Sequence, residues 1–549
     1  MSFTAAVESW LGAVEPEVVA ELERNAQVLT LDPGAVVVRE GSPPNACFLV
    51  LGGRLTAHGP GECVGCSEVL AGVPYRASVT ALRETRVARL DARVLEQVLG
   101  RSAKASLGLA RSLASPKHAA PEPSHWALVL LGSSPRLREA AARLVGALER
   151  LEPTLHVTPA KRPELDAAWL EAQAREHRHV VLELDAEPND WGRLALRHAD
   201  RVVLLAEASD RVVETTVVPP ERECTLVLLH PDRRRRPTGT ARWLSARRVS
   251  RHVHVATDTP ADFERAARVL TGRSVAVALS GGGSRGFAHI GALRALREAG
   301  IPIDAFGGTS TGAAMGAQAA MGLDFDEMIE LNRRIFSHKP FRELTMPVFS
   351  LIGGTRVDRG LQEAYGDLDL EDLWVPHLAV SASLSTARLF VHERGPVWKA
   401  VRASCSLPAV AVPVLEGGQL LVDGGLINNL PVDLLRERGA GRVIAFNASG
   451  TGGALGGPPA TEFPSPWRAL VQRLTGDAAL PGIVDILMRS VQLASDGHAR
   501  AMGELADFHV RFPVEKYAIF DVERVREIAL AGYEHAKPIV AGWNFSRSP

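Results

Sequence analysis

The sequence predicts an α/β protein of several domains, and three observations support this fold class. Strand-like and helix-like segments alternate from about residue 125 onward, which is typical of parallel sheets covered by helices. Two glycine-rich turns each follow an apolar strand-like run and precede a helix-like stretch. The first hundred residues differ, because short β-like runs there are separated by Pro and Gly turns. A chain of 549 residues is too long for one core, so we expect about two to four domains.

The second glycine-rich turn is the most informative feature. Residues 308–312 are Gly-Thr-Ser-Thr-Gly, the G-x-S-x-G pattern that exposes a serine hydroxyl at a sharp strand-to-helix turn. Residues 303–306 look like a short buried strand, and the small apolar residues 313–321 look like a helix packed tightly on a sheet. The pattern therefore predicts a nucleophile at Ser310.

The first glycine-rich turn supplies the complementary part of such a site. It covers residues 281–286, follows the strand-like run 275–279 and precedes the helical spacing of residues 287–299. Glycines leave backbone N–H groups bare at the start of a helix, where they can stabilise a developing oxyanion. A serine on one turn and free N–H groups on the other indicate acyl transfer.

A carboxylate completes the set. Asp423-Gly424-Gly425 follows the apolar run 419–422, so an aspartate emerges at the end of a strand with little bulk behind it. An aspartate within hydrogen-bond reach of a serine can act as its base without a histidine. We therefore expect Asp423 to activate Ser310.

In this order, the three signatures resemble the patatin-like phospholipases, which use a Ser–Asp dyad. The resemblance implies a three-layer α/β/α domain over residues 273–549, in which Ser310 forms an acyl-enzyme that water activated by Asp423 hydrolyses. It implies no metal, no calcium and no other cofactor. The remaining site residues that it implies are an oxyanion hole of Gly281, Gly282, Gly283, Ser284, Arg285 and Gly286, the elbow glycines Gly308 and Gly312, and the base-loop glycines Gly424 and Gly425.

Other polar residues near these motifs have separate interpretations. Arg285 either contacts a phospholipid phosphate or pairs with an acidic residue to hold the oxyanion loop. His289 lies on the helix directly after that loop, a position that argues against a Ser–His–Asp triad. Ser404 and Ser406 lack elbow glycines and are expected only to line a connecting segment. Asn428 and Asn429 are expected to support the base loop.

Residues 1–113 resemble a cyclic-nucleotide-binding domain, a β-roll flanked by helices. The matching marks are Gly34, the segment 48–53 and the stretch 65–79, which corresponds to the phosphate-binding cassette. Arg76 stands where the resemblance implies an arginine that pairs with the cyclic phosphate. Cys66 occupies the position of the expected ribose-binding glutamate, so nucleotide binding and a degenerate regulatory module both stay open.

Residues 114–124 are rich in Pro and Ala and predict a linker, and residues 125–272 predict a Rossmann-like α/β domain. Its first strand runs into Gly-Ser-Ser-Pro at residues 132–135, which lacks the G-K-[ST] of a P-loop. The order of the blocks resembles bacterial relatives of neuropathy target esterase. Animal forms begin with a membrane helix, which we do not find here, so we expect no permanent membrane anchor.

Charge and hydropathy limit the partners and the cellular location that we expect. The net charge of −1 gives no general attraction to nucleic acid, and no apolar run approaches the length of a membrane span. The start of the chain lacks a signal peptide, so we expect a cytoplasmic protein, with peripheral contact at the inner membrane surface left open. The four arginines at 233–236 indicate either a lipid-binding patch or a solvated loop.

Five cysteines do not form a disulfide framework in a chain of this length. Cys63 and Cys66 form a lone C-x-x-C without a second ligand pair nearby, so we expect two small buried side chains rather than a zinc or redox site.

These features favour a serine esterase that hydrolyses phospholipids, most of all lysophospholipids, and releases fatty acid. Two alternatives remain: an esterase or thioesterase with a non-phospholipid substrate, and a nucleotide-responsive scaffold whose hydrolase is vestigial. No nucleic-acid partner is expected.

Overall fold

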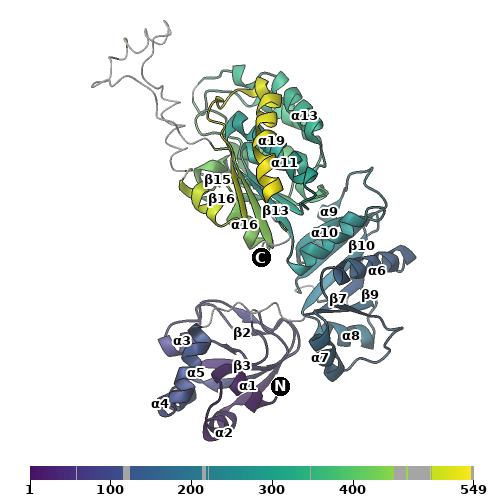
Figure 1. Ribbon diagram of the computed structural model, residues 1–549, viewed down its shortest axis with the longest axis vertical. Helices are drawn as coiled ribbons and strands as arrows, with labels where there is room; N and C mark the ends of the chain where they lie inside the picture. Colours follow the sequence, from purple (N-terminus) through teal and green to yellow (C-terminus); the bar gives the residue numbers. More distant parts are fainter. Residues whose placement is uncertain are drawn as a thin grey trace. The chain divides into compact units, whose positions relative to one another are not determined.

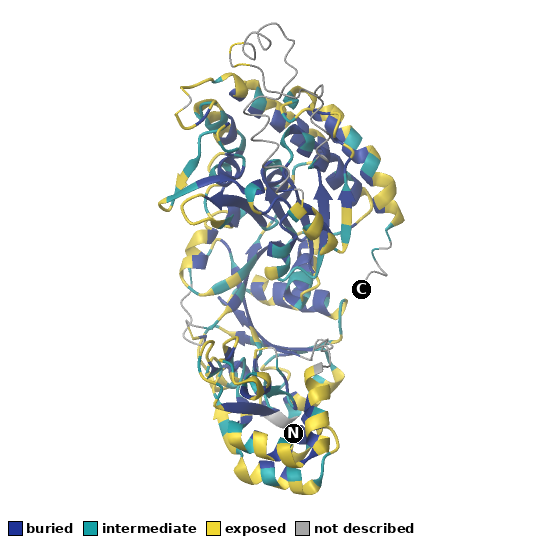
Figure 2. Ribbon diagram, turned by 90° about the vertical axis from the view of Figure 1, so that its left-hand side faces the viewer, coloured by how far each residue is buried: buried dark blue, intermediate teal, exposed yellow. Residues whose placement is uncertain are grey.

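The structure is a computed structural model, and it divides into two compact units. It describes residues 1–56, 58–114, 124–212, 218–219, 222–346, 348–449 and 497–543, together with Ser465, Trp467, Ser495 and Phe545. One unit contains residues 1–231 and 241–267, and the other contains residues 232–240 and 268–549. Figure 1 shows the elements of each, and Figure 2 shows that the strands form the buried interior.

The first unit begins with an antiparallel β-roll. Its four-stranded sheet has the order β1-β6-β3-β4, and β2 pairs with β5 beside it. The strands are β1 (Gln27–Leu31), β2 (Val36–Val38), β3 (Ala46–Gly52), β4 (Cys63–Val64), β5 (Val79–Thr80) and β6 (Thr85–Asp91). The helices are α1 (Phe3–Leu11), α2 (Pro16–Asn25), α3 (Cys66–Ala71), α4 (Ala92–Arg101) and α5 (Ala103–Ala114).

One helical pattern of the roll is divided in two. The periodicity of residues 92–107 predicts a single helix, but the structure ends α4 at Arg101 and begins α5 at Ala103. Ser102 lies between them with φ −114° and ψ 110°. Its hydroxyl accepts a hydrogen bond from Ala105 N at 3.1 Å, which is the bond of a helix N-cap. A capping side chain therefore interrupts a helix that the apolar spacing alone would continue.

The first unit continues with a six-stranded parallel sheet in the order β12-β11-β10-β7-β9-β8. Its first strand, β7, lies inside the sheet, and helices pack on both faces, with α6 on one and α8 on the other (Figure 1). The strands are β7 (Ser124–Leu130), β8 (Thr154–Val157), β9 (His179–Asp185), β10 (Arg201–Glu207), β11 (Cys224–His230) and β12 (Val249–Ala256). The helices are α6 (Pro135–Glu149), α7 (Ala167–Glu176), α8 (Asp190–His198), α9 (Thr240–Ser245) and α10 (Pro260–Thr271), the last two of which reach or cross the boundary between the units.

This sheet is Rossmann-like, with one exchange of neighbours. A Rossmann sheet has its strands in the order 3-2-1-4-5-6. Numbered within this sheet, the observed order is 2-3-1-4-5-6, because β9 rather than β8 pairs with β7. The turn after β7 carries no lysine, and Ser134 caps α6 by accepting from Arg136 N at 3.2 Å.

The second unit contains an eight-stranded mixed sheet. Its order is β17-β18-β15-β14-β13-β19-β20, and β16 also pairs with β15. The strands are β13 (Val275–Leu279), β14 (Ala305–Thr309), β15 (His377–Ser383), β16 (Arg388–His392), β17 (Val414–Glu416), β18 (Gln419–Asp423), β19 (Arg442–Asn447) and β20 (Phe508–Arg511). The main helices are α11 (Ala288–Glu298), α12 (Thr311–Ala320), α13 (Phe325–Ser337), α14 (Thr355–Tyr365), α15 (Val397–Ser404), α16 (Val432–Glu437) and α19 (Val525–Gly542).

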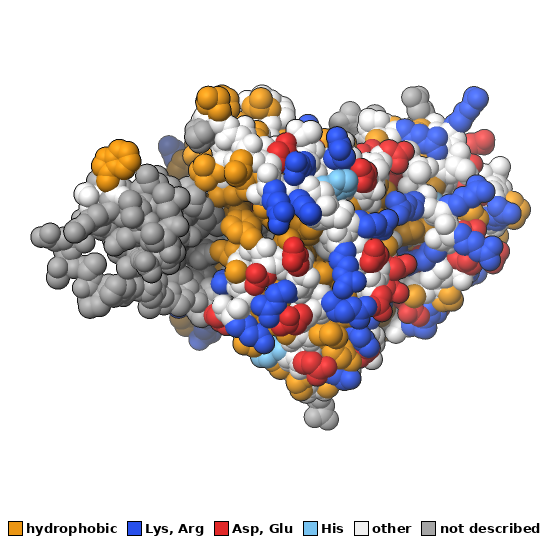
Figure 3. Space-filling view, turned by 90° about the horizontal axis from the view of Figure 1, so that it is seen from above, with side chains coloured by type: hydrophobic (Ala, Val, Ile, Leu, Met, Phe, Trp, Pro, Cys, Tyr) orange, Lys and Arg blue, Asp and Glu red, His pale blue; other side chains and the backbone are white. Residues whose placement is uncertain are grey.

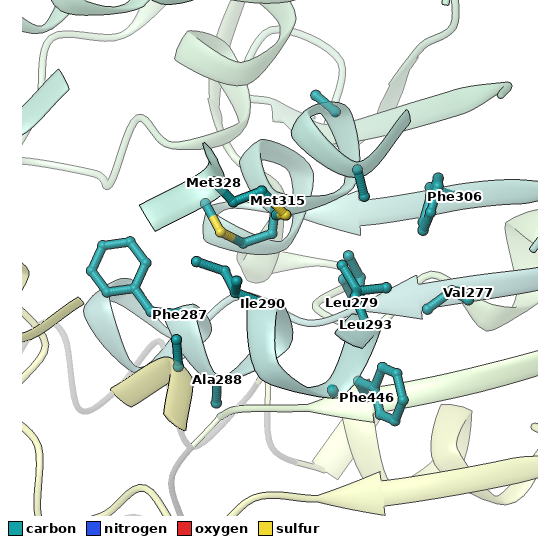
Figure 4. Close-up of a cluster of buried hydrophobic side chains, with 14 of the residues drawn as sticks. Val277, Leu279, Phe287, Ala288, Ile290, Leu293, Phe306, Met315, Met328 and Phe446 are labelled. Atoms are coloured by element: carbon teal, nitrogen blue, oxygen red, sulfur yellow. The ribbon is translucent and has the colours of Figure 1, made fainter. Parts of the chain in front are cut away.

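Strand β13 packs against helices on both of its faces. Val277 and Leu279 belong to the cluster that contains Phe287 and Ile290 (Figure 4), whereas Ala276 and Ala278 belong to a second cluster with Leu435 of α16. Successive side chains of a strand point to opposite faces, so this division follows from period-2 geometry. The arrangement is the expected layering of helices on both sides of a sheet.

The strand before the serine begins later than the sequence predicts. We expected it at 303–306, but β14 starts at Ala305. Asp304 is buried, and both of its carboxylate oxygens accept hydrogen bonds from Arg268, at 2.7 and 2.9 Å. It also accepts from Val275 N at 2.8 Å. The backbone N–H of Asp304 still donates to the Val275 carbonyl at 2.7 Å, and the Asp304 carboxylate takes the return bond from Val275 N in place of a backbone carbonyl.

Of the expected linker at 114–124, residues 115–123 lie outside the described residues. Ala114 ends α5, and Ser124 begins β7. The other domain boundaries stay predictions.

Candidate active site

Ser310 lies at a strained turn between β14 and α12. Its backbone has φ 55° and ψ −126°, an unusual conformation for a residue that is not glycine. The flanking glycines make the turn sterically feasible, because a Cβ on Gly308 would lie 2.3 Å from the Gly312 carbonyl oxygen. A Cβ on Gly312 would in turn lie 2.2 Å from the Leu279 carbonyl oxygen. The turn therefore has the form expected of a nucleophile elbow.

A second serine fixes this turn from the neighbouring helix. The backbone N–H of Ser310 donates to Ser404 Oγ at 2.8 Å, and the Ser404 hydroxyl donates to the Val380 carbonyl at 2.6 Å. Ser404 is the last residue of α15 and is fully buried. We expected only a connecting segment at Ser404 and Ser406, so this contact is one that the motifs do not reveal.

Asp423 reaches the same edge of the sheet through strand register. In the sheet Asp423 pairs with Ser381, and the adjacent Val380 of β15 pairs with Thr309, which directly precedes Ser310. The Thr309 hydroxyl also donates to the Asn428 carbonyl at 2.8 Å, which links the serine turn to the base loop. The topology therefore brings Ser310 and Asp423 together across two strands.

The carboxyl of Asp423 is buried and only partly satisfied. Its Oδ1 accepts from Gly425 N at 2.8 Å, whereas Oδ2 has no hydrogen-bond partner among the described residues. Burial raises the pKa of Asp423 to about 6, and the nearby Ser310 hydroxyl and the Gly425 N–H oppose part of this rise. No hydrogen bond of normal length joins the two side chains in this structure, and such bonds are commonly loose without substrate.

The glycine-rich loop is held by contacts with two distant segments. Gly281 N donates to Asn429 Oδ1 at 3.1 Å, which gives one of the two expected supporting asparagines a definite contact. Gly283 has φ 59°, and a Cβ there would lie 2.5 Å from Ile519. A side chain at this position would therefore displace the loop.

The N–H groups of this loop are not equally available. Gly281 and Ser284 donate to the carbonyls of Asn429 and Ile519, at 3.3 and 2.8 Å. The N–H groups of Gly282 and Gly283 have no acceptor among the described residues. These two are the donors left for a ligand.

Arg285 takes a structural role within the described contacts. Its Nε donates to the Tyr517 carbonyl at 2.7 Å, and the neighbouring Ser284 hydroxyl donates to the Ala518 carbonyl at 2.6 Å. These two bonds connect the glycine-rich loop to the segment 517–519. The two interpretations of Arg285, contact with a lipid phosphate and pairing with an acidic residue, stay predictions.

Ser310 opens onto an apolar cavity of about 150 Å³. The Gly283 backbone and the side chains of Thr311 and Ala314 line it near the serine. Farther away the walls are aromatic and aliphatic, and they include Phe287, Ile335, Phe336, Phe341, Leu361 and Phe520. Such a lining suits a hydrocarbon chain better than a polar substrate.

Arg402 is the charged residue in this lining, and its guanidinium group hydrogen-bonds to other parts of the protein. It pairs with Asp358 of α14 at 2.6 Å, donates to Ser406 Oγ at 2.5 Å and donates to the Val412 carbonyl at 3.0 Å. These bonds connect α14, α15 and the segment 406–412. Arg402 therefore braces one wall of the cavity.

His289 does not take part in a triad in this structure. Its Nε2 bonds to the Ser280 carbonyl at 2.9 Å, and its ring packs edge-on against Phe512. Burial lowers the pKa of His289 to about 4, so the ring is neutral at physiological pH. That the site relies on an aspartate alone stays a prediction.

Arg76 lies exposed at a separate cavity of about 1010 Å³ in the β-roll, which Glu68 also lines. Its predicted contact with a cyclic phosphate stays a prediction.

Known protein families match three parts of the chain. The models described as patatin-like phospholipase, neuropathy target esterase family P-loop like domain and cyclic nucleotide-binding domain match residues 277–436, 161–271 and 28–102. These matches confirm the expected family resemblances and the expected fold class. No described helix is long and apolar enough to cross a membrane.

Two relatives match most of this chain, and one solved structure matches a small part of it. Human patatin-like phospholipase domain-containing protein 6 is 28% identical over 94% of this chain, which spans 44% of that protein. An uncharacterized NTE family protein of Mycobacterium bovis is 31% identical over 90% of this chain and 88% of its own length. A putative cyclic nucleotide binding protein of Ruegeria pomeroyi of known structure covers 20% of this chain and 56% of its own, with 17% identity and a TM-score of 0.18.

Proposed function

This chain belongs to the NTE (neuropathy target esterase) family, whose patatin-like domain it carries, and we propose that it is a serine esterase that cleaves (lyso)phospholipid carboxylic esters through Ser310 and Asp423. The observation that carries the proposal is the position of Ser310. It stands at a strained elbow beside a buried carboxyl with an unpartnered oxygen among the described residues, and it opens onto an apolar cavity.

The proposed reaction begins with attack by the Ser310 hydroxyl on the ester carbonyl. Asp423 Oδ2 accepts the serine proton as the Oγ–C bond forms. A pKa of about 6 makes Asp423 a stronger base than an ordinary aspartate, while most of it stays ionised at pH 7. The tetrahedral intermediate then breaks its bond to the ester oxygen and expels the deacylated part of the lipid as its alcohol, which takes the proton from Asp423.

The negative charge on the carbonyl oxygen needs donors in a dry environment. We assign the N–H groups of Gly282 and Gly283 to this role, because the N–H groups on either side of them are already used. Losing one such donor typically costs about 3 kcal/mol of transition-state stabilisation. Water activated by Asp423 then cleaves the acyl-enzyme and releases the fatty acid.

The substrate class follows from the cavity. An acyl chain of a lipid can occupy the apolar walls, whereas the charged headgroup would stay at the mouth, in contact with water. A lysophospholipid leaves a single chain to accommodate. This fits the apolar cavity of about 150 Å³ that Ser310 lines.

An exposed apolar segment supports peripheral contact with a lipid surface. Leu344, Met346, Val348 and Phe349 are each more than 70% exposed, and they lie between Phe341 and Ile352, which line the cavity. Soluble proteins rarely expose so many large apolar side chains in one segment without a binding role. Figure 3 shows hydrophobic side chains gathered among charged ones on the face that it views. We assign these four side chains to the membrane surface.

The experiment is fatty acid release from lysophosphatidylcholine by wild type, Ser310→Ala and Asp423→Asn. Both variants should lose activity while they keep wild-type circular dichroism. If the wild type is inactive on this lipid but cleaves a short activated ester through Ser310, the result would support the serine esterase chemistry and show that the proposed lipid substrate class is wrong. Lipid hydrolysis that persists in Ser310→Ala would overturn the whole proposal.

A further inference from the structure

Three cysteines from three successive elements meet in the β-roll. Cys47 lies in β3, Cys63 in β4, and Cys66 begins α3. Their three Sγ atoms all lie within 4.8 Å of one another. The pairing of Leu49 with Cys63 turns Cys47 and Cys63 toward the same face of the β3–β4 pair. Sequence reasoning treated the C-x-x-C as two buried side chains because the third sulfur lies on another strand.

The spacing of the sulfurs matches what a metal ion requires. A d¹⁰ ion bound about 2.3 Å from each of three thiolates holds the sulfurs about 4 Å apart. The observed separations therefore need to shorten by less than about 1 Å. Within the described residues no His, Asp or Glu completes the group, so the ligand set is three sulfurs alone. Thiolates of this kind select Cu(I) and Zn(II) over harder ions.

We propose that Cys47, Cys63 and Cys66 form a binding site for one thiophilic d¹⁰ cation, Cu(I) or Zn(II). Cys47 and Cys66 are buried, whereas Cys63 is half-buried, and Cys63 and Cys66 line the cavity that also contains Glu68 and Arg76. This cavity gives access for the ion and room for a water molecule as a fourth ligand. The ion would sit beside the stretch that resembles a phosphate-binding cassette, where Cys66 stands in place of the expected glutamate.

The direct test is metal loading of the full-length reduced protein under anaerobic conditions. Aliquots receive excess Zn²⁺ or Cu⁺, are freed of unbound ion, and are analysed for metal per chain. We expect about one ion per chain for at least one of the two metals. The amount of metal bound per chain should fall at least tenfold in each of the variants Cys47→Ser, Cys63→Ser and Cys66→Ser, because two thiolates form a much weaker site. Cys224→Ser is the matched control, because Cys224 is buried on β11, outside the cluster, and should not affect loading.

A second readout does not depend on whether the variants fold. Bound metal should slow alkylation of Cys63 and Cys66 in the wild type, as measured by mass spectrometry of the digested protein, and leave Cys224 unchanged. Failure of both ions to load at stoichiometric level, or loading that is indifferent to Cys47, would overturn the proposal. A stable disulfide among the three cysteines in protein purified without oxidant would overturn it too, since it would assign the cluster to thiol redox chemistry.

Discussion

The hydroxyl of Ser404 connects the backbone N–H of Ser310 to the Val380 carbonyl, with distances of 2.8 and 2.6 Å. One side chain thus ties the elbow between β14 and α12 to the end of α15 and to strand β15. Because Ser310 has a conformation that non-glycine residues rarely adopt, a neighbouring group must hold it there. Ser404 is the group that does so.

We predict that Ser404→Ala lowers kcat by about 10- to 100-fold and leaves KM nearly unchanged, because a small misplacement of a nucleophile is costly. The variant should also lose about 1–3 kcal/mol of stability, since Val380 and Ser310 each lose a buried partner. Ester kinetics and urea unfolding measure the two effects. A fall in stability with an unchanged kcat would restrict Ser404 to a purely structural role.

The pH profile of the reaction should report the ionisation of Asp423. Only the carboxylate can accept the serine proton, so kcat/KM should fall about tenfold per pH unit below the pKa of about 6. A soluble short-chain ester gives the cleanest profile, because its own charge does not change in this range. An apparent pKa near 4 would mean that Asp423 is solvated and does not act as described.

The same burial means that ionised Asp423 lowers the free energy of unfolding. Because the pKa of Asp423 is higher in the folded state than its ordinary value of 3.8, the folded protein is most stable below pH 3.8, where the carboxyl is protonated in both states. This stability is lost as the pH rises through about 6 and the buried carboxyl ionises. Asp423→Asn should therefore stabilise the protein at pH 7.5, by about 2–3 kcal/mol, while it abolishes hydrolysis. This gain should shrink as the pH falls toward 4. Thermal unfolding at both pH values tests the prediction, and a destabilised variant at pH 7.5 would contradict it.

Gly283→Ala should lower kcat far more than the strain of its positive φ alone would. A Cβ there would collide with Ile519, and the displaced N–H would cost about 100-fold in kcat. Gly300 is the matched control, because it has φ 67° but no atom lies within 4 Å of the position that a Cβ would occupy there. Gly300→Ala should cost about 1 kcal/mol of stability and no activity. Equal activities of the two variants would show that loop geometry at Gly283 does not matter.

The exposed side chains of Leu344, Met346, Val348 and Phe349 should matter only at a lipid surface. Phe349→Glu should reduce binding to phosphatidylcholine vesicles and lipid hydrolysis at least tenfold, because a charge cannot enter the apolar layer at low cost. Hydrolysis of a soluble short-chain ester should be unchanged. Leu505→Glu is the control, since Leu505 is 55% exposed and lies beside Arg436 of α16. A similar loss with both variants would show a general effect of charge rather than a docking segment.

Local motifs predicted much of the fold and the main residues of the candidate site. Strand β13 lies at 275–279 as expected, and the elbow and base-loop sequences place Ser310 and Asp423 on neighbouring parts of one sheet. The positions of these turns could be predicted because a glycine-rich turn after a strand depends on backbone sterics that are local in sequence. The catalytic roles of Ser310 and Asp423 stay predictions.

The contacts that sequence reasoning missed all join segments far apart in the chain. Ser404 contacts a residue 94 positions earlier, and Ile519 accepts from the glycine-rich loop across more than 230 residues. Cys47 reaches the C-x-x-C through the pairing of β3 with β4. No periodicity or motif encodes such pairings, which depend on strand register and helix packing.

The central claim is that Ser310 is the nucleophile, and the most direct test is to map the site of covalent reaction with a fluorophosphonate. We expect one phosphonyl group per chain on the peptide that contains Ser310, with loss of hydrolysis in proportion to labelling and no labelling of Ser310→Ala. Phosphonylation of a different residue that accompanies inactivation, or full hydrolysis by a protein labelled on Ser310, would contradict it.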